Sequence, residues 1–116
     1  MSLKRLKPGK RMSQGVTRGK AIYLAGQVAD KTAGGSVGEQ TEEILGQIDD
    51  LLAKADSDKT KIMMATIYLA DISTFGEMNA EWDKWVVEGA TPARATVEAK
   101  LVAPEYKIEI VIVATT

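Results

Sequence analysis

Along the first half of the chain, the apolar residues first follow the pattern of two strands joined by a turn and then the spacing of a helix. Residues 11–29 contain two apolar-rich runs around the turn-forming pair Arg18-Gly19, which predicts a β-hairpin. From residue 37 to residue 55, apolar side chains return at helical spacing. Ser36 and Glu39, just before this run, have the spacing of a capping box, so we expect a helix over 37–55.

The second half of the chain predicts one buried strand, a second helix and two further strands. Residues 62–70, IMMATIYLA, are apolar on both alternating faces, as in a central strand covered on two sides. Strands are also expected within 93–101 and 106–115, on either side of a turn that contains Pro104. A helix ending near Gly89 is indicated by an apolar stripe of Phe75, Met78, Trp82, Trp85 and Val86. Because both tryptophans belong to this stripe, core packing is favoured over a ligand-stacking role.

The order β-β-α-β-α-β-β predicts an α+β fold, a two-layer sandwich with a mixed sheet and both helices on one face. At 116 residues the chain is expected to form a single domain over 1–116. If the alanine face of strand 93–101 and the isoleucine face of the last strand meet the helices, Arg94 and Thr96 lie on the opposite face. That face combines valines, threonines and a few charges, which suits a subunit interface.

Charge and hydropathy narrow the function classes. Fifteen basic and 16 acidic residues give a net charge of −1, which argues against a general nucleic-acid or membrane surface. The basic residues near the start are interpreted as a solvated terminus: Lys4, Arg5, Lys7, Lys10 and Arg11. No apolar run approaches the roughly 20 residues of a membrane span, and the start lacks the apolar core of a signal peptide, so a cytoplasmic location is expected.

Cysteine and histidine are both absent from the sequence. Their absence excludes disulfides, thiolate nucleophiles, Ser-His-Asp triads and the usual zinc ligand sets. Any catalysis must therefore use arginine, lysine, carboxylates, hydroxyls, main-chain groups and water, and neither a metal nor another cofactor is expected. The polar residues Ser13, Gln14, Tyr23 and Gln27 are candidates for the rim of a pocket, but polar strand residues are usually just exposed, so exposure is favoured for them.

Arg94, in the stretch TPARATVEAK, is surrounded by small residues. Glu98 is too far for an ion pair along the strand, at about 13 Å for four residues. A guanidinium at this place needs an acceptor from another strand, another subunit or a ligand, and its planar fork best matches a carboxylate. A ligand anchor and an interface ion pair both remain open on this evidence.

Several short motifs, in order and with suitable spacing, resemble the reactive intermediate deaminase family, also called RidA or YjgF-like. The resemblance runs over nearly the whole chain from about Arg11. The motifs are Gly15, Ala25-Gly26-Gln27-Val28, Glu39-Gln40-Thr41, Phe75 with Asn79, Pro92 to Glu98, and Lys107 to Ile110.

The resemblance implies a chorismate-mutase-like sandwich assembled as a homotrimer, with ligand sites in the clefts between subunits. Members of the family that act as enzymes hydrolyse enamines and imines such as 2-aminoacrylate, without a cofactor, to ammonia and a 2-keto acid. The substrate implied here is therefore a small molecule bearing a carboxylate.

The resemblance also assigns roles to individual residues. It implies that Arg94 grips the substrate carboxylate and that Glu109 acts on the water near the imine carbon. Gly26 and Asn79 match pocket-lining positions, and Thr96 matches a substrate-binding position at which cysteine is common.

Two departures from the family pattern indicate a divergent subgroup. Lys10-Arg11-Met12 stands where many members carry a tyrosine, and Val111 stands where a second glutamate often follows. The retained arginine favours carboxylate binding, whereas the lost tyrosine leaves the substrate open. One alternative is a non-catalytic protein that binds small carboxylates. A ribonuclease or translation inhibitor is less favoured, because the charge is balanced and histidine is absent.

Overall fold

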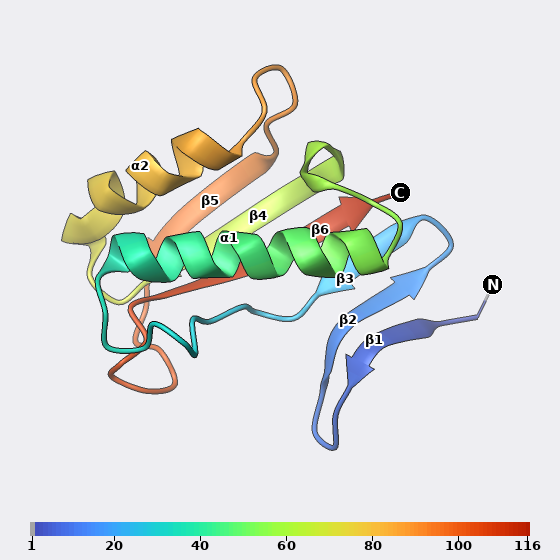
Figure 1. Cartoon of the computed structure of the whole chain (residues 1–116), viewed down its shortest axis with the longest axis horizontal. Helices are drawn as coiled ribbons and strands as arrows, with labels where there is room; N and C mark the ends of the chain where they lie inside the picture. The colour runs from blue at the N-terminus through green and yellow to red at the C-terminus, as the bar shows by residue number, and fades with distance from the viewer. Residues whose placement is uncertain (1) are drawn as a thin grey trace.

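The computed structural model describes residues 2–116, which form one mixed sheet with two helices packed on the same face (Figure 1). The strands are β1 (Lys4–Pro8), β2 (Ser13–Arg18), β3 (Ala21–Leu24), β4 (Ile62–Leu69), β5 (Ala93–Glu98) and β6 (Ile108–Thr115). The helices are α1 (Val37–Lys54) and α2 (Phe75–Trp85). The strand order is β1-β2-β3-β6-β4-β5, and β4 pairs in parallel with β5 but antiparallel with β6. The expected α+β sandwich is confirmed.

The start of α1 is the expected capping box. The Ser36 hydroxyl accepts a hydrogen bond from the Glu39 main-chain N–H at 3.1 Å, and the Glu39 carboxylate accepts one from the Ser36 N–H at 3.0 Å. These bonds hold the pKa of Glu39 below its usual value because they stabilise the ionised carboxylate. The predicted helix is confirmed to within one residue, whereas α2 ends four residues before Gly89.

The hydrophobic core lies between the helices and the sheet. The side chains of β6 that were expected to meet the helices are fully buried: Ile108, Ile110, Ile112 and Ala114. Trp82 is 5% exposed and belongs to this core, and Trp85 packs against its margin. The structural role expected of both tryptophans is therefore confirmed, although Trp82 also has a polar neighbour described below.

β1 was missed by the sequence analysis, which interpreted its basic residues as a solvated terminus. It pairs antiparallel with β2, for example Lys4 with Thr17 and Leu6 with Gly15. Only Leu6 in this strand is even partly buried, so the sequence of β1 lacks the alternation of apolar and polar residues that predicts a strand. The β1–β2 hairpin extends away from the helices (Figure 1).

The orientation predicted for β5 is wrong. In the parallel pairing, Arg94 lies beside Ala65 and Thr96 beside Ile67, and both of these β4 residues are fully buried on the helix side. Arg94 and Thr96 therefore face α2, and the alanines of β5 face the other way. The physical reason is that β5 is an edge strand beside α2, whose aromatic rings cover the arginine side chain.

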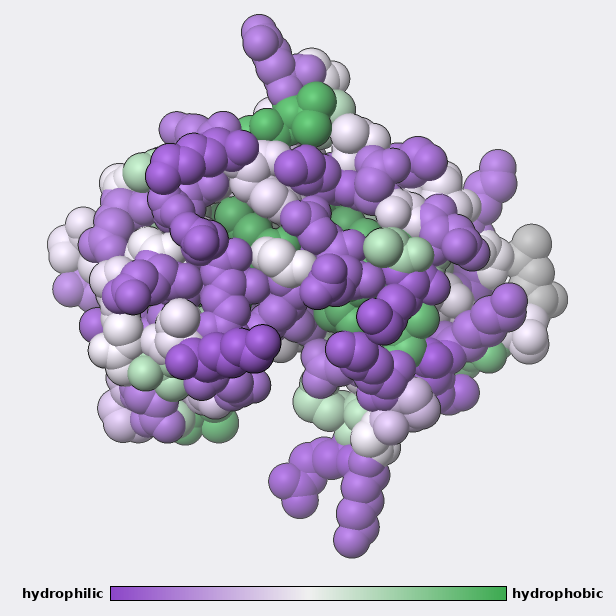
Figure 2. All heavy atoms as spheres, viewed as in Figure 1, coloured by the Kyte–Doolittle hydropathy of each residue, from purple (hydrophilic) through white to green (hydrophobic). Residues whose placement is uncertain are grey.

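The sheet face without helices, hereafter the open face, is lined by small, apolar and weakly polar side chains. Its members on β3, β6, β4 and β5 include one charged residue, Glu109, together with Tyr23, Met64, Thr66, Tyr68, Ala95, Val97, Val111 and Val113. Tyr23 is 57% exposed and Val97 is 45% exposed. By contrast, the helix side of the molecule is mostly hydrophilic (Figure 2).

Candidate functional site

Arg94 lies at the edge of the sheet against one face of α2. Its Nη1 donates a hydrogen bond of 2.8 Å to Oδ1 of Asn79. Its guanidinium carbon lies 5.2 Å from the centre of the Trp82 ring and 5.6 Å from that of Phe75. Both distances fall within the range of a cation–π interaction. The structure thus brings together Arg94 and Asn79, two of the expected site residues.

No carboxylate neutralises Arg94 within the described chain. Across residues 2–116, the one ion pair shorter than 4 Å joins Lys84 and Glu81 on α2. The guanidinium is half-buried, yet its one hydrogen-bond acceptor among these residues is a neutral amide. Since Arg94 keeps its charge at any physiological pH, an anion would be stabilised beside it.

Thr96, two residues further along β5 on the same face, has a buried hydroxyl oxygen. Among residues 2–116 this oxygen has no hydrogen-bond partner. Buried hydroxyls are normally hydrogen-bonded, so the unpaired Thr96 hydroxyl, on the same strand face as Arg94, lowers the stability of the folded chain.

Glu109 and Gly26 form a second group on the open-face side of the sheet. Glu109 pairs with Tyr68 of β4, whose side chain points away from the helices. Its carboxylate lies directly against the Gly26 backbone, so that a methyl group on Gly26 would overlap Oε2 of Glu109. An added methyl group at position 26 would therefore force the flexible end of the Glu109 side chain to move, so glycine is favoured there by close approach rather than by backbone angle.

The two groups do not meet within one chain. Arg94 lies opposite Ala65, and Glu109 lies opposite Tyr68, with β4 between their strands. Three residues along β4 and two strand spacings separate their Cα atoms by roughly 14 Å. They also point to opposite faces of the sheet. The chain therefore carries two half-sites rather than one closed site.

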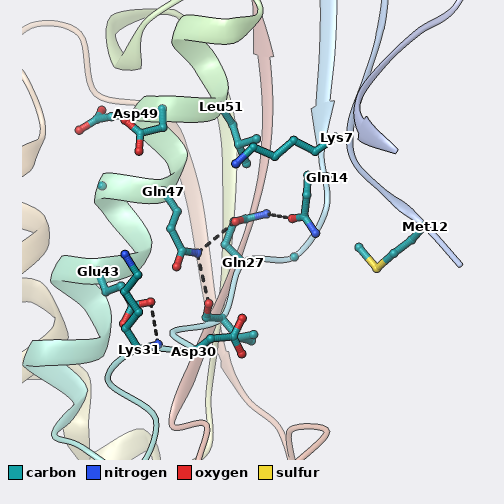
Figure 3. Close-up of a pocket in the computed structure, with 14 residues that line it drawn as sticks. Lys7, Met12, Gln14, Gln27, Asp30, Lys31, Glu43, Gln47, Asp49 and Leu51 are labelled. Atoms are coloured by element: carbon teal, nitrogen blue, oxygen red, sulfur yellow. Dashed lines mark hydrogen bonds between the residues drawn. The ribbon is translucent and has the colours of Figure 1, made fainter. Parts of the chain in front are cut away.

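A groove of about 870 Å³ between α1 and the β2–β3 region adjoins the second half-site (Figure 3). Three glutamine side chains cross it in a hydrogen-bonded chain. Nε2 of Gln47 donates to Oε1 of Gln27 at 3.1 Å, and Nε2 of Gln27 donates to Oε1 of Gln14 at 2.9 Å. The amide nitrogens of Gln47 and Gln27 also donate to the carbonyls of Val28 and Ala25, respectively. These bonds fix which end of each amide donates and which end accepts along the row of glutamines.

The glutamine chain holds the segment next to Glu109 in place. Gln27 is only 5% exposed, and its main chain exchanges hydrogen bonds with Ile110 in both directions, at 2.9 and 3.1 Å. Gly26 and Glu109 are the neighbours of these two residues, so their contact is set by the same bonds. The interpretation of Gln27 as an exposed residue is therefore wrong.

Two acidic residues of the groove, Asp49 and Glu43, are engaged within the fold. Oδ2 of Asp49 accepts a hydrogen bond from the Trp85 indole at 3.0 Å. Burial alone would raise the pKa of Glu43, but hydrogen bonds from Thr32 and Lys31 outweigh it and lower the pKa. Glu43 thus orders the loop before α1, and these two carboxylates have structural roles, whereas Asp50, which also lines the groove, is exposed.

Sequence reasoning missed the aromatic neighbours of Arg94 and the glutamine chain. Phe75, Asn79 and Trp82 are spaced by four and three residues, which places them on one helix face, and this spacing could have linked the two rings to Asn79. The glutamines are 13 and 20 residues apart, and no short-range pattern connects them. Among the described residues, no cluster of three or more acidic residues suitable for a metal ion occurs. Within the same range, neither helix is long and apolar enough to cross a bilayer.

The fold and the half-sites define a small α+β protein with a half-buried arginine at the sheet edge and a glutamate on the opposite face. Residues 2–116 match the family profile described as Endoribonuclease L-PSP, and the chain belongs to this family. The resemblance to RidA and YjgF-like proteins is thereby confirmed.

Individual relatives agree with this assignment. The chain is 46% identical over 115 residues to a RutC family protein of Haemophilus influenzae, covering 99% of each. It is 34% identical over 107 residues to the 2-iminobutanoate/2-iminopropanoate deaminase of Rattus norvegicus, covering 88% of this chain and 77% of the rat protein. A crystal structure of a YjgF family member from Neisseria meningitidis superposes with a TM-score of 0.96 at 41% identity, covering 100% of this chain and 96% of that one.

Proposed function

We propose that this protein hydrolyses a small imine or enamine bearing a carboxylate, giving ammonia and a 2-keto acid. The observation that carries the proposal is Arg94, a half-buried guanidinium with a neutral hydrogen-bond partner and free donors at the sheet edge. A carboxylate is the anion that its planar fork fits best. The similarity to the rat deaminase, whose name states an imine substrate, supports the choice of reaction.

The chemistry needs only an anchor, a placed water and a proton acceptor. An enamine first takes up a proton at carbon and becomes the imine. Water then adds to the imine carbon, Glu109 accepts a proton from that water, and the protonated Glu109 passes it to the nitrogen. As the C–N bond of the resulting carbinolamine breaks, its hydroxyl returns a proton to Glu109, ammonia leaves, and the carbonyl of the 2-keto acid forms.

We propose further that the working site combines two chains of a homotrimer. Arg94 and Glu109 of one chain are roughly 14 Å apart on opposite sheet faces, too far to hold one small substrate. The open face is partly exposed and largely apolar, which favours burial against a second copy. Packing it on a neighbour would bring Glu109 of one chain toward Arg94 of the next.

Substitution of the two charged residues tests the proposal. Small amino-acid-derived imines are generated in situ by an amino-acid oxidase, and ammonia release is followed above the buffer rate. Glu109→Gln keeps a hydrogen-bonding side chain but cannot take a proton, so turnover should fall by about 10²-fold while substrate still binds. Arg94→Lys keeps the charge but loses the two-pronged contact, so binding itself should weaken.

Two results would contradict the proposal. Equal turnover by wild type and Glu109→Gln would show that Glu109 is not the base. Failure of the wild type to exceed the buffer rate on every imine, with carboxylate binding intact, would favour a non-catalytic carboxylate-binding protein instead.

A further inference from the structure

The guanidinium of Arg94 is held by three residues from one face of α2. Phe75, Asn79 and Trp82 follow one another at intervals of four and three residues, so their side chains line the same stripe of the helix. Trp82 is 5% exposed and fixed in the core, whereas Phe75 is 39% exposed at the rim. One ring is therefore anchored in the core and the other lies at the surface.

The two aromatic rings of this arrangement stabilise the cation without using its hydrogen-bond donors. A carboxylate in the place of either ring would neutralise Arg94 and occupy two of its N–H groups. An aromatic ring attracts a cation through its π-electron face and needs no N–H donor. Of the five guanidinium N–H groups, one donates to Asn79, and no other acceptor within residues 2–116 engages the remaining four.

We propose that Phe75 and Trp82 are positioning residues for Arg94, holding its guanidinium ready for a ligand carboxylate. The inference rests on the proposed role of Arg94 as the carboxylate anchor. The two rings act through Arg94 and need not touch the ligand. Loss of the outer ring should leave the fold intact but let the arginine side chain move, which costs binding through lost pre-organisation.

Trp82 also provides an optical signal for carboxylate binding. The sequence contains two tryptophans, and replacement of Trp85 by Phe leaves Trp82 as the sole indole. A carboxylate that pairs with Arg94 changes the field at a ring whose centre is 5.2 Å from the guanidinium carbon. The emission of Trp82 should therefore change as the ligand saturates.

The test uses pyruvate as a stable 2-keto acid probe and the full-length protein. Calorimetric titration should show about two- to fivefold weaker pyruvate binding for Phe75→Leu, the loss expected for one exposed cation–π contact. Phe75→Tyr keeps the ring and should bind like the wild type. In the Trp85→Phe protein, pyruvate should change the tryptophan emission, and Arg94→Gln in that background should remove the change.

Several outcomes would overturn the inference. Pyruvate affinity that is equal in Phe75→Leu and wild type, or that falls equally in Phe75→Leu and Phe75→Tyr, would show that the ring does not position Arg94. A wild type that binds no pyruvate would contradict both this inference and the carboxylate anchor. Pyruvate binding that depends on the Phe75 ring, in a protein without imine turnover, would support the inference and contradict only the proposed reaction.

Discussion

At the scale of single residues, the Thr96 hydroxyl and the Gly26 backbone show how the site departs from ordinary packing. The Thr96 oxygen is buried and unpaired among the described residues, and the Glu109 carboxylate lies where a Gly26 side chain would be. Neither feature improves the packing of an isolated chain. Both lie beside charged groups that the proposed reaction uses, and such local costs are common at functional sites.

The unpaired hydroxyl leads to a prediction about stability. Thr96→Val replaces the hydroxyl by a methyl group of similar size, so the free energy of unfolding should rise by about 1 kcal/mol. Thr41→Val is the matched control. Thr41 is a fully buried threonine, whereas Thr96 is partly exposed with only its hydroxyl oxygen buried. The Thr41 hydroxyl donates to the Val37 carbonyl at 2.7 Å, so its loss should lower stability by about 1 kcal/mol.

Urea denaturation of both variants beside the wild type checks this expectation. A loss of stability in Thr96→Val comparable to that in Thr41→Val would contradict it. Such a loss would mean that the Thr96 hydroxyl finds a partner in the assembled protein, from a neighbouring chain or from a bound ligand.

At the scale of elements, the sequence predicted most of the secondary structure but misplaced one strand face. The capping box and the helical spacing located α1, and the apolar run of β4 located the centre of the sheet. β1 was missed because its pairing depends on the main chain of β2 and not on an apolar pattern. The facing of β5 was wrong because a stripe of alanines resembles a buried face, whereas the long stem of Arg94 packs under aromatic rings.

The candidate site was predictable only in part, because its geometry also depends on which face of the sheet each residue occupies. Arg94, Asn79, Gly26 and Glu109 were identified from short motifs, and the structure shows the expected neighbours in pairs: Arg94 with Asn79, and Gly26 with Glu109. Motifs say nothing about which sheet face a residue occupies, so the separation of the two pairs could not be foreseen. The glutamine chain depends on contacts across the tertiary fold.

Helix α1 contains a glycine that its packing does not require. Gly46 lies on the exposed side of the helix, and an added methyl group would meet no atom within 4 Å. Glycine in a helix interior costs about 0.5–1 kcal/mol relative to alanine, so Gly46→Ala should raise the free energy of unfolding by that amount. Thermal and urea unfolding would measure it.

Gly26→Ala provides the contrasting control, because its methyl group would displace the Glu109 carboxylate. This variant should lose imine turnover, while its free energy of unfolding should change little because the displaced carboxylate is the end of a flexible side chain. If Gly46→Ala destabilised the protein instead, the exposed side of α1 would have to be in close contact with another chain, since nothing in its own chain opposes the methyl group.

At the scale of the whole molecule, the two faces of the sheet differ in how far they are covered from solvent. The helix side is covered and mostly hydrophilic at its surface (Figure 2), whereas the open face leaves Tyr23 and Val97 about half exposed. A single layer of two helices cannot cover both faces of a six-stranded sheet. Assembly through the open face would bury these side chains, and the proposed trimer requires that Glu109 on the open face of one chain meets the β5 edge with Arg94 of the next.

The arrangement predicts complementation between two inactive variants. In a cyclic trimer each site would take Arg94 from one chain and Glu109 from its neighbour. Arg94→Gln and Glu109→Gln homotrimers should each lack most activity. Unfolding and refolding them together in equal amounts should form mixed trimers with one intact site each, so that about a quarter of all sites in the sample contain both native residues.

Imine turnover should therefore recover to about a quarter of the wild-type rate in the mixed sample, and light scattering should give the mass of three chains. Separate refolding of each variant, followed by mixing of the intact proteins, is the control and should restore much less. If Arg94 and Glu109 of the same chain formed the site, no co-refolded trimer would contain an intact site, and activity would stay at the level of the single variants. A monomer in light scattering would exclude the shared site. In one chain the Cα atoms of Arg94 and Glu109 are roughly 14 Å apart and their side chains lie on opposite faces of the sheet, so a monomer has no neighbouring chain to complete the site.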